Sequence, residues 1–455
     1  MPIPVIAIFD IGKTNKKFFL FSEQYQIVYE RSVHFAEITD EDGFACDDIQ
    51  ALTSWVNEML AEAMLLADFV IKSVNVSAYG ASFVHIDDKG HPVGALYNYL
   101  NPYPEELQET FYAKYGGQIA FSLATASPVL GNLNSGLQIY RLLHQRPGWY
   151  EKVAYSLHLP QYISYLVSGK PAAEITSIGC HTALWDFARK QYHEWVYAEQ
   201  LGEKFPPVLR SDTTIAIELK GQQLKAGIGM HDSSAALVPY LRSFSEPFIL
   251  ISTGTWCISL NPFNNEPLTE EELRQDCLCY LDYHRRPVKA SRIFAGNEHG
   301  QEVKRISAHF AVQERFYQTM TFDPSIYAGL RADHTAKDAM TGLQHSAFVT
   351  RDLSVFGTVE EAYHQLIFDL IQQQQISVSL VLSKQAPARI FVDGGFARNT
   401  LYMHMLAHAF PRMEIYAASV SQASAMGAAL AIHDDWNNQP VPGDMVDLKY
   451  YTVAR

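Results

Sequence analysis

Residues 5–15 read VIAIFDIGKTN, an apolar run that breaks at a short polar turn and resumes as FFLF at 18–21. Residues 248–256 read FILISTGTW and resume as ISL at 258–260, and residues 389–395 read RIFVDGG. An apolar run that breaks and resumes in this way is typical of a strand–turn–strand hairpin. Glycine-bearing turns leave backbone N–H groups available and let the backbone approach a phosphate closely. The three segments together predict a nucleotide held by two halves of one molecule.

Composition narrows the class of protein. The chain has 455 residues, for which two domains are the natural expectation, and 48% of them are apolar, which suits folded cores. The formal net charge of −14 argues against nucleic acid and anionic membranes as partners, because both require a basic surface. The five cysteines are too few for a disulfide framework. With no signal-like N-terminus and no run of about 18 apolar residues, the sequence predicts a cytoplasmic protein.

The order of predicted elements repeats along the chain. Each half begins with a hairpin and ends with a strand and a Gly-bearing turn, which predicts the duplication of one α/β unit. The boundary is expected near residues 242–243, where RSFSEP interrupts the apolar pattern. This gives a first domain over 1–242 and a second over 243–455.

Local patterns predict further elements. Gln372 to Gln375 are expected on an exposed face of the long helix. The other predictions are a helix over 48–70, a strand at 83–86 that forms a hairpin through the turn at 87–90, a mostly helical stretch over 100–210, a helix opening at about 232 and a long helix over 359–383.

Four segments occur in an order that resembles the FGGY carbohydrate kinases: the opening hairpin, GMHD at 229–232, STGTW at 252–256 and DGGFARN at 393–399. The resemblance covers essentially the whole chain, and the four segments together are specific, whereas any one alone is weak. It implies an α/β fold of two ribonuclease-H-like domains, as in the actin and sugar kinase superfamily, with a cleft between them. It also implies that sugar binds mainly to the first domain and ATP mainly to the second.

The opening hairpin carries the residues that the resemblance assigns to metal and phosphate. Asp10 matches an aspartate that holds Mg²⁺ near the β- and γ-phosphates, a role that suits a carboxylate. Gly12 lets the turn approach the phosphate, and Thr14 and Asn15 can donate hydrogen bonds to it. Lys13 stands where many relatives have a small residue, and a cation there can still face phosphate.

Asp232 resembles the family's catalytic base. Phosphoryl transfer needs an in-line nucleophile, charge neutralisation and a group that accepts the hydroxyl proton. An aspartate at the start of a helix suits that role, although the same position also suits a plain N-cap. The neighbouring His231 is expected either to contact the sugar or to be a buried structural histidine.

The second half carries the residues that the resemblance assigns to ATP. Thr253, Gly254 and Thr255 resemble the second phosphate motif, whose hydroxyls and N–H groups cradle phosphates. Gly394 and Gly395 resemble the adenosine motif, in which the missing Cβ atoms let the backbone lie against the nucleoside, with Arg398 and Asn399 following. Residues 424–429 match the small-residue helix behind the adenine pocket.

The sugar is less well defined. STGTW and the GNEHG segment at 296–300 look most like the rhamnulokinase and L-fuculokinase side of the family, which implies a 6-deoxy-ketohexose phosphorylated at O1. Two charged sugar contacts common among relatives are replaced by Ser82 and Asn98. Other polar contacts are expected from Glu174, Thr176 and His181 and from the segment 134–138.

Other functions stay open from the sequence alone. One is a kinase for a pentulose, glycerol or another polyol. Another is an actin-like or chaperone-type ATP switch, against which Asp232 argues, since such a protein needs no catalytic base at the domain junction. A sugar-responsive regulator is disfavoured because no basic DNA-binding segment precedes residue 5. A catalytically inactive sugar-binding homologue and a homodimer are also left open.

Overall fold

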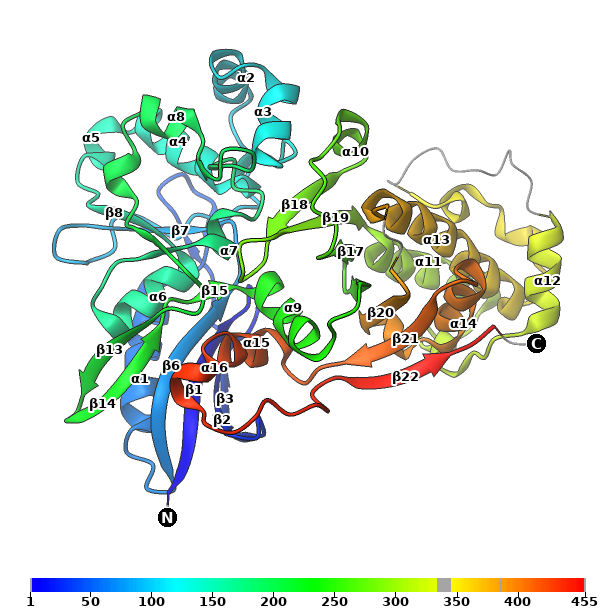
Figure 1. Ribbon diagram of the computed structural model, residues 1–455. Coiled ribbons are helices and arrows are strands. Elements are labelled where there is room, and N and C mark those ends of the chain that lie inside the picture. The colour runs from blue at the N-terminus through cyan, green and yellow to red at the C-terminus, as the bar shows by residue number, and fades with distance from the viewer. Residues whose placement is uncertain (1, 334–344, 385–386, 454–455) are drawn as a thin grey trace. The chain divides into compact units, whose positions relative to one another are not determined.

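The opening hairpin is formed as predicted. β1 (Ile3–Ile11) and β2 (Lys16–Ser22) pair antiparallel, with Asp10 opposite Lys17. β1 also runs parallel to β6 (Phe69–Ala78). The connection between these two parallel strands includes the helix α1 (Ile49–Ala63), as a crossover between parallel strands usually does (Figure 1). The computed structural model describes residues 2–333, 345–384 and 387–453.

The contacts between residues divide the chain into two units. The first comprises Met1–Ser243, Cys279–Arg286 and Ser421–Met445, and the second comprises Phe244–Leu278, Pro287–Val420 and Val446–Arg455. Two segments from the second half of the sequence therefore group with the first half. A division into domains at residues 242–243 stays a prediction.

Two mixed sheets share one strand order. The first runs β13-β14-β6-β1-β2-β3, with β15 (Met230–His231) pairing with β6, and the second runs β22-β21-β20-β16-β17-β19-β18. In both sheets the first hairpin strand is parallel to the next strand inward, β1 to β6 and β16 to β20. The strands are otherwise matched in direction at each equivalent position. This correspondence is the repeat that the sequence order predicts.

The remaining α-helices and strands of the first unit lie mostly between β6 and β13 along the chain. They are β3 (Ile27–Val33), β4 (Ile38–Thr39), β5 (Ala45–Cys46), β7 (Phe83–Ile86), α2 (Glu105–Lys114), α3 (Gln118–Thr125), α4 (Ser135–Gln145), α5 (Pro147–Tyr150), β8 (Tyr155–His158), α6 (Leu159–Ser168), β9 (Ala173–Glu174), α7 (Ile175–Ile178), β10 (Trp185–Asp186), β11 (Gln191–Tyr192), α8 (Glu194–Ala198), β12 (Val208–Leu209), β13 (Thr214–Leu219), β14 (Gln222–Gly227), α9 (Asp232–Ser243), α15 (Ala423–Ala431) and α16 (His433–Trp436).

The second sheet and the helices that follow its strands complete the described elements. They are β16 (Phe248–Thr253), β17 (Cys257–Asn261), α10 (Glu270–Arg274), β18 (Cys277–Leu281), β19 (Pro287–Ile293), α11 (Ala295–Phe310), α12 (Pro324–Asp333), α13 (Val359–Val381), β20 (Arg389–Gly394), α14 (Thr400–Ala409), β21 (Glu414–Ser419) and β22 (Asp447–Tyr451). None of the helices in the described residues is long and apolar enough to cross a membrane.

Three local predictions need correction. The helix predicted over 48–70 ends at Ala63, because Phe69 already pairs with Ile3 in the sheet. The turn after residue 86 forms, with the Asp87 N–H donating to the His91 carbonyl over 3.0 Å. The strand before it, however, pairs with the distant β8 and makes only a single bridge, from Ile86 to Pro92, across that turn.

The glutamine run of α13 is the third correction, since two of its members are buried. Gln374 is 1% exposed, and its amide donates to the Ser259 hydroxyl over 2.8 Å. Gln375 donates to the Ala409 carbonyl over 3.1 Å. The helix packs into a core on both sides of this stretch, so the polar run satisfies neighbouring groups instead of facing water.

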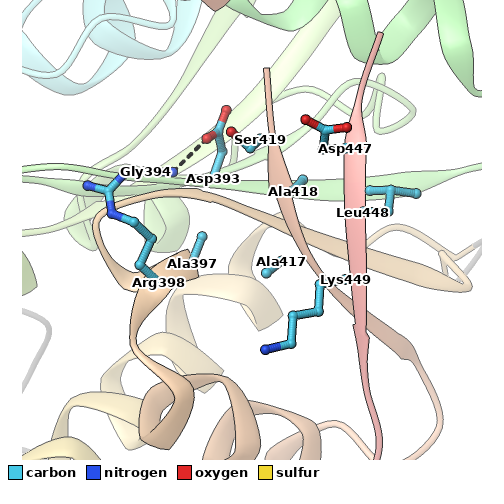
Figure 2. A pocket seen from close by; sticks show the side chains of 10 residues that line it. All are labelled: Asp393, Gly394, Ala397, Arg398, Ala417, Ala418, Ser419, Asp447, Leu448 and Lys449. Carbon is cyan, nitrogen blue, oxygen red and sulfur yellow. Dashed lines mark hydrogen bonds between the residues drawn. The ribbon is translucent and has the colours of Figure 1, made fainter. Parts of the chain in front are cut away.

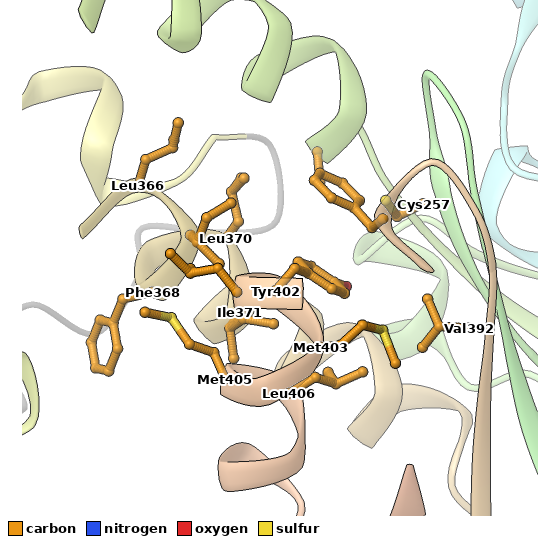
Figure 3. Packing of buried hydrophobic residues seen from close by; sticks show 14 of the residues in the cluster. Cys257, Leu366, Phe368, Leu370, Ile371, Val392, Tyr402, Met403, Met405 and Leu406 are labelled. Atoms are coloured by element: carbon orange, nitrogen blue, oxygen red, sulfur yellow. The ribbon is translucent and has the colours of Figure 1, made fainter. Parts of the chain in front are cut away.

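The core of the second unit lies between its sheet and the helices α13 and α14. Figure 3 shows Leu366 and Leu370 of α13 beside Tyr402 and Leu406 of α14, with Val392 of β20 nearby. These side chains are fully or almost fully buried. The long α13 begins with a capping box, in which Thr358 and Glu361 satisfy each other's backbone N–H groups. This packing fixes the ends of β16 and β20, where two of the predicted nucleotide turns lie.

Candidate functional site

The β1–β2 turn places Asp10 at the end of a buried strand. The Gly12 N–H donates to the Asn15 carbonyl over 2.9 Å, and a Cβ atom on Gly12 would lie 3.1 Å from that oxygen. The turn is therefore tight, and glycine suits it. Thr14 and Asn15 are exposed at its tip, so their polar groups can meet a ligand.

Asp10 has an unusual electrostatic environment. Its pKa is raised to about 6: burial raises it most, a hydrogen bond from Ser424 lowers it, and the charge of Asp232 raises it. The Ser424 hydroxyl donates to Asp10 Oδ2 over 3.1 Å. The charge of Asp232 therefore reaches Asp10, and both predicted site residues belong to the first unit. A cation beside them would relieve their mutual repulsion.

Asp232 begins α9, directly after β15. The strand β15 pairs with the end of β6, with His231 opposite Ala78, so the sheet itself sets where the helix starts. Asp232 Oδ1 accepts a hydrogen bond from the Ser233 N–H over 2.6 Å. Its side chain is 33% exposed, yet the surrounding protein raises its pKa to about 6 by desolvation. An exposed carboxylate with a pKa near neutrality can accept a proton from a bound hydroxyl.

His231 is held rigidly beside Asp232. Its Nε2 lies 3.2 Å from Asp232 Oδ1, and burial lowers its pKa to about 4, which keeps the ring neutral. A Cβ atom on Gly80 would lie 2.7 Å from the His231 ring, so only glycine leaves room for the ring there. Within the described part of the chain, His231 Nδ1 is buried without a hydrogen-bond partner.

Glu174 and Thr176 support His231 from behind. The Thr176 hydroxyl accepts a hydrogen bond from the backbone N–H of His231 over 3.0 Å and donates one to the Glu174 carboxylate over 2.6 Å. Glu174 also accepts hydrogen bonds from the Ser211 hydroxyl and the Ser177 N–H. Both predicted sugar contacts are thus fully buried and satisfied by protein groups. Their observed role is to position the segment that carries Asp232.

The other predicted sugar contacts are also engaged within the protein. The Asn98 amide donates to the Ala45 carbonyl over 3.3 Å, and its Oδ1 accepts the Leu100 N–H over 3.0 Å. Ser82 is 1% exposed. In the segment 134–138, Gln138 donates to the Ala81 carbonyl over 2.8 Å. His181 lies with its ring 6.2 Å from that of Tyr280, a residue that sequence reasoning did not single out.

Lys13 and its neighbours form contacts that the sequence did not predict. The Lys13 ammonium lies 2.5 Å from Asp47 Oδ2 and 3.5 Å from Glu37. It therefore contacts carboxylates of the first unit. Nothing in the spacing of Lys13 and Asp47 along the chain pointed to this pair.

In the second unit, Thr253 links the two nucleotide turns. Its hydroxyl donates to the Asp393 carbonyl over 2.5 Å and accepts the Phe396 N–H over 3.0 Å. Its own carbonyl accepts the Gly395 N–H over 2.9 Å. Thr253 is 5% exposed, whereas Gly254 and Thr255 are exposed. The exposed pair is therefore better placed to meet phosphate than Thr253.

Gly394 occupies a position that only glycine can fill. Its φ is +91°, and a Cβ atom would lie 1.9 Å from the Thr253 carbonyl oxygen. Asn399 accepts the Tyr402 N–H, which caps α14, and its amide donates to the Tyr363 hydroxyl over 2.7 Å. Asn399 is thus engaged in the protein, as Thr253 is.

Two hollows in the second unit adjoin the predicted nucleotide residues. The first, of about 250 Å³, contains Gly394 and Arg398 (Figure 2). Its other lining residues are Asp393, Ala397, Ala417, Ala418, Ser419, Asp447, Leu448 and Lys449. The second, of about 450 Å³, is lined by Gly254, Thr255, Gly296, Asn297, Gly300, Gln301 and Lys304.

The second hollow exists because two turns meet closely. A Cβ atom on Gly296 would lie 1.8 Å from the Gly254 carbonyl oxygen, and the Asn297 N–H donates to the Thr255 carbonyl over 3.0 Å. The start of α11 is thereby fixed against the phosphate-type turn. The GNEHG pattern in the sequence pointed to this segment, but not to Gln301 or Lys304, which follow one helical turn later.

The helix α15 packs closely on α9, and its predicted place behind an adenine pocket stays a prediction. It groups with the first unit, where Gly427 packs so tightly on α9 that a Cβ atom would lie 1.8 Å from the Ala235 carbonyl oxygen. Its first turn supplies Ser424 to Asp10. The small residues at 424–429 thus allow close helix packing and support Asp10.

Two family models match the chain. Residues 5–234 match the FGGY family of carbohydrate kinases, N-terminal domain, and residues 245–329 and 361–440 match the carbohydrate kinase FGGY, C-terminal domain. A rhamnulokinase from Mannheimia succiniciproducens is 22% identical over 204 residues, 42% of this chain and 41% of that protein. A rhamnulokinase from Halalkalibacterium halodurans is 22% identical over 258 residues, 54% of this chain and 52% of that protein. The matches span about half the length of these relatives.

Solved structures share the fold along the whole chain. A carbohydrate kinase from Novosphingobium aromaticivorans has a TM-score of 0.80 at 22% identity, covering 99% of this chain and 95% of that one. Ligand-bound xylulose kinase from Lactobacillus acidophilus has a TM-score of 0.75 at 14% identity, covering 99% and 94%. Plasmodium falciparum glycerol kinase with ADP has a TM-score of 0.72 at 14% identity, covering 95% and 90%.

Proposed function

Since this chain belongs to the FGGY family of carbohydrate kinases, we propose that it transfers the γ-phosphoryl group of ATP to a hydroxyl of a sugar. The observation that carries this proposal is Asp232, a partly exposed carboxylate whose pKa is raised to about 6 at the start of α9. A protein that only switches on ATP has no need of such a group. The interaction of its charge with Asp10 adds support, because phosphoryl transfer requires a base and a charge-neutralising group in one place.

In the proposed reaction, Asp232 accepts the proton of the attacking sugar hydroxyl. The sugar oxygen forms a bond to the γ-phosphorus as the bond from that phosphorus to the β–γ bridging oxygen breaks, and ADP leaves. The neutral His231 holds Asp232 in place through its 3.2 Å contact.

ATP would be held mainly by backbone groups. We assign its phosphates to the exposed Gly254 and Thr255, with Thr14 and Asn15 as further donors. The adenosine is assigned to the surface around Gly394 and Arg398, which line the hollow of about 250 Å³. The net charge of −14 makes such local donors necessary, because the protein as a whole repels an anion.

The residues around Asp10 suit Mg²⁺. Carboxylate and hydroxyl oxygens are the ligands that this ion prefers, and the raised pKa of Asp10 marks a place where a cation is stabilising. Among the described residues, no group of three acidic, His or Cys side chains could hold a metal by itself. Asp10 would therefore bind Mg²⁺ together with water and phosphate oxygens. When bound, the ion would neutralise charge on the phosphates.

For the sugar, we propose a 6-deoxy-ketohexose such as L-rhamnulose or L-fuculose. Two relatives of this chain, each 22% identical to it, are rhamnulokinases. Ser82 and Asn98 place no charged side chain where relatives often have one, which suits a substrate with fewer hydroxyl groups to bind. The second candidate is a pentulose, because a xylulose kinase shares the fold over 99% of this chain.

A substrate panel tests the proposal. The purified protein is given Mg²⁺ and ATP with L-rhamnulose, L-fuculose, D-xylulose, D-ribulose or glycerol, and ADP release and sugar phosphate are measured together. ADP release that depends on one ketose and yields its phosphate ester is expected. ATP hydrolysis without any phosphorylated acceptor would favour a switch protein, and silence across a broader panel would argue against a kinase. The homodimer stays a prediction, for which sedimentation of the same sample is the measurement.

A further inference from the structure

The carboxylate of Asp47 ties together both ends of the β1–β2 turn. Asp47 Oδ1 accepts a hydrogen bond from the Lys16 ammonium over 2.7 Å, and Oδ2 accepts one from the Lys13 ammonium over 2.5 Å. The Tyr79 hydroxyl, at the end of β6, donates to the same Oδ2 over 2.9 Å. The Lys16 ammonium also donates to the Lys13 carbonyl over 2.9 Å. One side chain thus links the turn to the neighbouring strand.

Burial makes this network costly to break. Lys16 is 2% exposed and Asp47 is 7% exposed. Burial by itself raises the pKa of Asp47, but the two ammonium groups outweigh it and hold that pKa below its ordinary value. Burial and the Asp47 charge raise the pKa of Tyr79 well above its ordinary value, so Tyr79 remains a donor. Without Asp47, the buried Lys16 charge would have no counter-ion in this network.

The turn that these contacts hold is the one assigned to phosphate. Residues 12–15 include Lys13 and directly precede Lys16, and Thr14 and Asn15 stay exposed at the tip. Lys13 keeps 24% of its side chain exposed. We propose that Asp47 is a positioning residue for ATP: it fixes Lys13 and Lys16 and thereby holds the backbone of the turn ready for phosphate.

The inference rests on the proposed function only for the identity of the ligand. The turn has few contacts of its own, since its single internal backbone bond joins Gly12 to Asn15. Binding of a phosphate by N–H groups requires that they already point in one direction. Asp47 supplies this order from outside the turn and needs no contact with substrate itself.

Asp47→Asn is the variant that tests it, and Asp42→Asn is the matched control. Asp42 lies five residues earlier, and its carboxylate also binds two cations, Arg141 and Arg146, but it does not touch the turn. Hydrogen exchange of the ligand-free protein, read on a peptide covering residues 12–16, is expected to quicken about tenfold in Asp47→Asn and to stay unchanged in Asp42→Asn. Equal exchange in Asp47→Asn and wild type would overturn the proposal.

Kinetics provide the second measurement. With the sugar saturating, Asp47→Asn is expected to lose about tenfold or more of kcat/KM for ATP, while the KM for the sugar changes by less than about twofold. An equal loss for both substrates would mean that Asp47 only stabilises the unit as a whole. If wild type phosphorylates no sugar, the proposed function fails, whereas hydrogen exchange still decides the role of Asp47.

A second variant guards against misfolding. Asp47→Asn leaves Lys16 charged and buried, which can unfold the unit. The double variant Lys16→Met with Asp47→Asn removes both buried charges and is expected to fold, as judged by a cooperative thermal transition. It still lacks the link across the turn, so quickened exchange at residues 12–16 is again expected. A folded double variant whose residues 12–16 exchange at the wild-type rate would contradict the proposal, as the same result in the single variant would.

Discussion

Asp232 combines two properties that a simple helix cap does not need. It caps its own helix through the Ser233 N–H, and it also keeps a third of its side chain exposed with a raised pKa. A cap is best fully ionised, since a charged carboxylate interacts more strongly with the start of a helix. The cost of holding Asp232 in a desolvated position therefore points to a use beyond capping.

Asp232→Asn is expected to lower kcat by about 10²- to 10⁴-fold, because the amide cannot accept the hydroxyl proton. Binding of ADP should change little, since the adenosine and phosphates are assigned to other residues, around Gly394 and Gly254. Steady-state kinetics and calorimetric titration with ADP measure the two effects. Near-normal turnover of this variant would remove Asp232 from the reaction.

The activity should depend on pH through the same group. A base works only when it is ionised, and the pKa of Asp232 is raised to about 6. We therefore expect kcat/KM to rise with pH between about 5 and 7 and then to level off. A profile that is flat down to pH 4.5 would contradict Asp232 as the base.

Asp232→Asn should lose activity but gain thermal stability near neutral pH. A carboxyl group whose pKa is higher in the folded than in the unfolded protein binds its proton more tightly when folded, so it destabilises the protein progressively as the pH rises from the unfolded pKa of 3.8 through the folded pKa of about 6. Removing the charge should stabilise the protein by about 1 kcal/mol at pH 7.5, a value reduced for the partial exposure of the side chain. The gain should vanish below about pH 4. Thermal unfolding at both pH values measures it.

At the scale of elements, the two nucleotide turns of the second unit act as one structure. Thr253 ends β16, Gly394 ends β20, and the two strands are parallel neighbours. The Thr253 carbonyl and hydroxyl satisfy the N–H groups of Gly395 and Phe396. The geometry of one turn therefore depends on the absence of a side chain in the other.

Gly394→Ala should destabilise the second unit by about 2 kcal/mol or more, because the new Cβ would meet the Thr253 carbonyl oxygen at 1.9 Å and φ is +91°. ADP binding should weaken as well. Gly329→Ala is the control, since Gly329 lies in α12 with open space around its Cβ position. It should stabilise the protein by about 0.5–1 kcal/mol. Equal effects of the two changes on thermal unfolding would contradict this account of Gly394.

At the scale of the whole molecule, the first unit is completed by residues from the end of the chain. α15 packs on α9, the Asn75 amide donates to the Ala428 carbonyl over 2.8 Å, and the Tyr25 hydroxyl lies 2.6 Å from His433 Nδ1. The same segment supplies Ser424 to Asp10. A unit built in this way depends on a segment that lies almost 200 residues after the first half ends.

A fragment of residues 1–243 should therefore not fold on its own. It lacks α15, and its loss would expose the apolar face of α9 and leave the Asn75 amide without its partner. We expect a fragment without a cooperative thermal transition and with strong binding of a hydrophobic dye. A fragment that unfolds cooperatively near the temperature of the full chain would instead support a domain boundary at residues 242–243.

The local parts of the site could be predicted because they depend on neighbouring residues. Turns such as those at Gly12 and Gly254 need glycine and small polar residues within a few positions, so both hairpins were predicted correctly. The start of α9 at Asp232 and the capping of α14 by Asn399 follow the same rule. Family resemblance extended these local patterns to a fold and a reaction class.

The remaining parts depend on contacts between distant residues. Whether the Lys13 ammonium faces a phosphate or Asp47, whether the Thr253 hydroxyl meets a ligand or the Asp393 carbonyl, and whether Gln374 faces water are settled by what packs nearby. The spacing of residues along the chain does not contain this information. The fold brings Asp47 to the β1–β2 turn and Ser424 to Asp10 across 34 and 414 residues.

The sequence by itself determined the two hairpins, the order of elements that the halves repeat and the family of this protein, because turn chemistry and apolar periodicity act over short distances. Only the tertiary structure decided which polar groups remain available to a ligand. Burial obliges each polar group to find a partner, and groups such as those of Thr253, Glu174 and Asn98 find theirs within the protein. Asp232, Thr14, Asn15, Gly254 and Thr255 remain exposed for the proposed reaction.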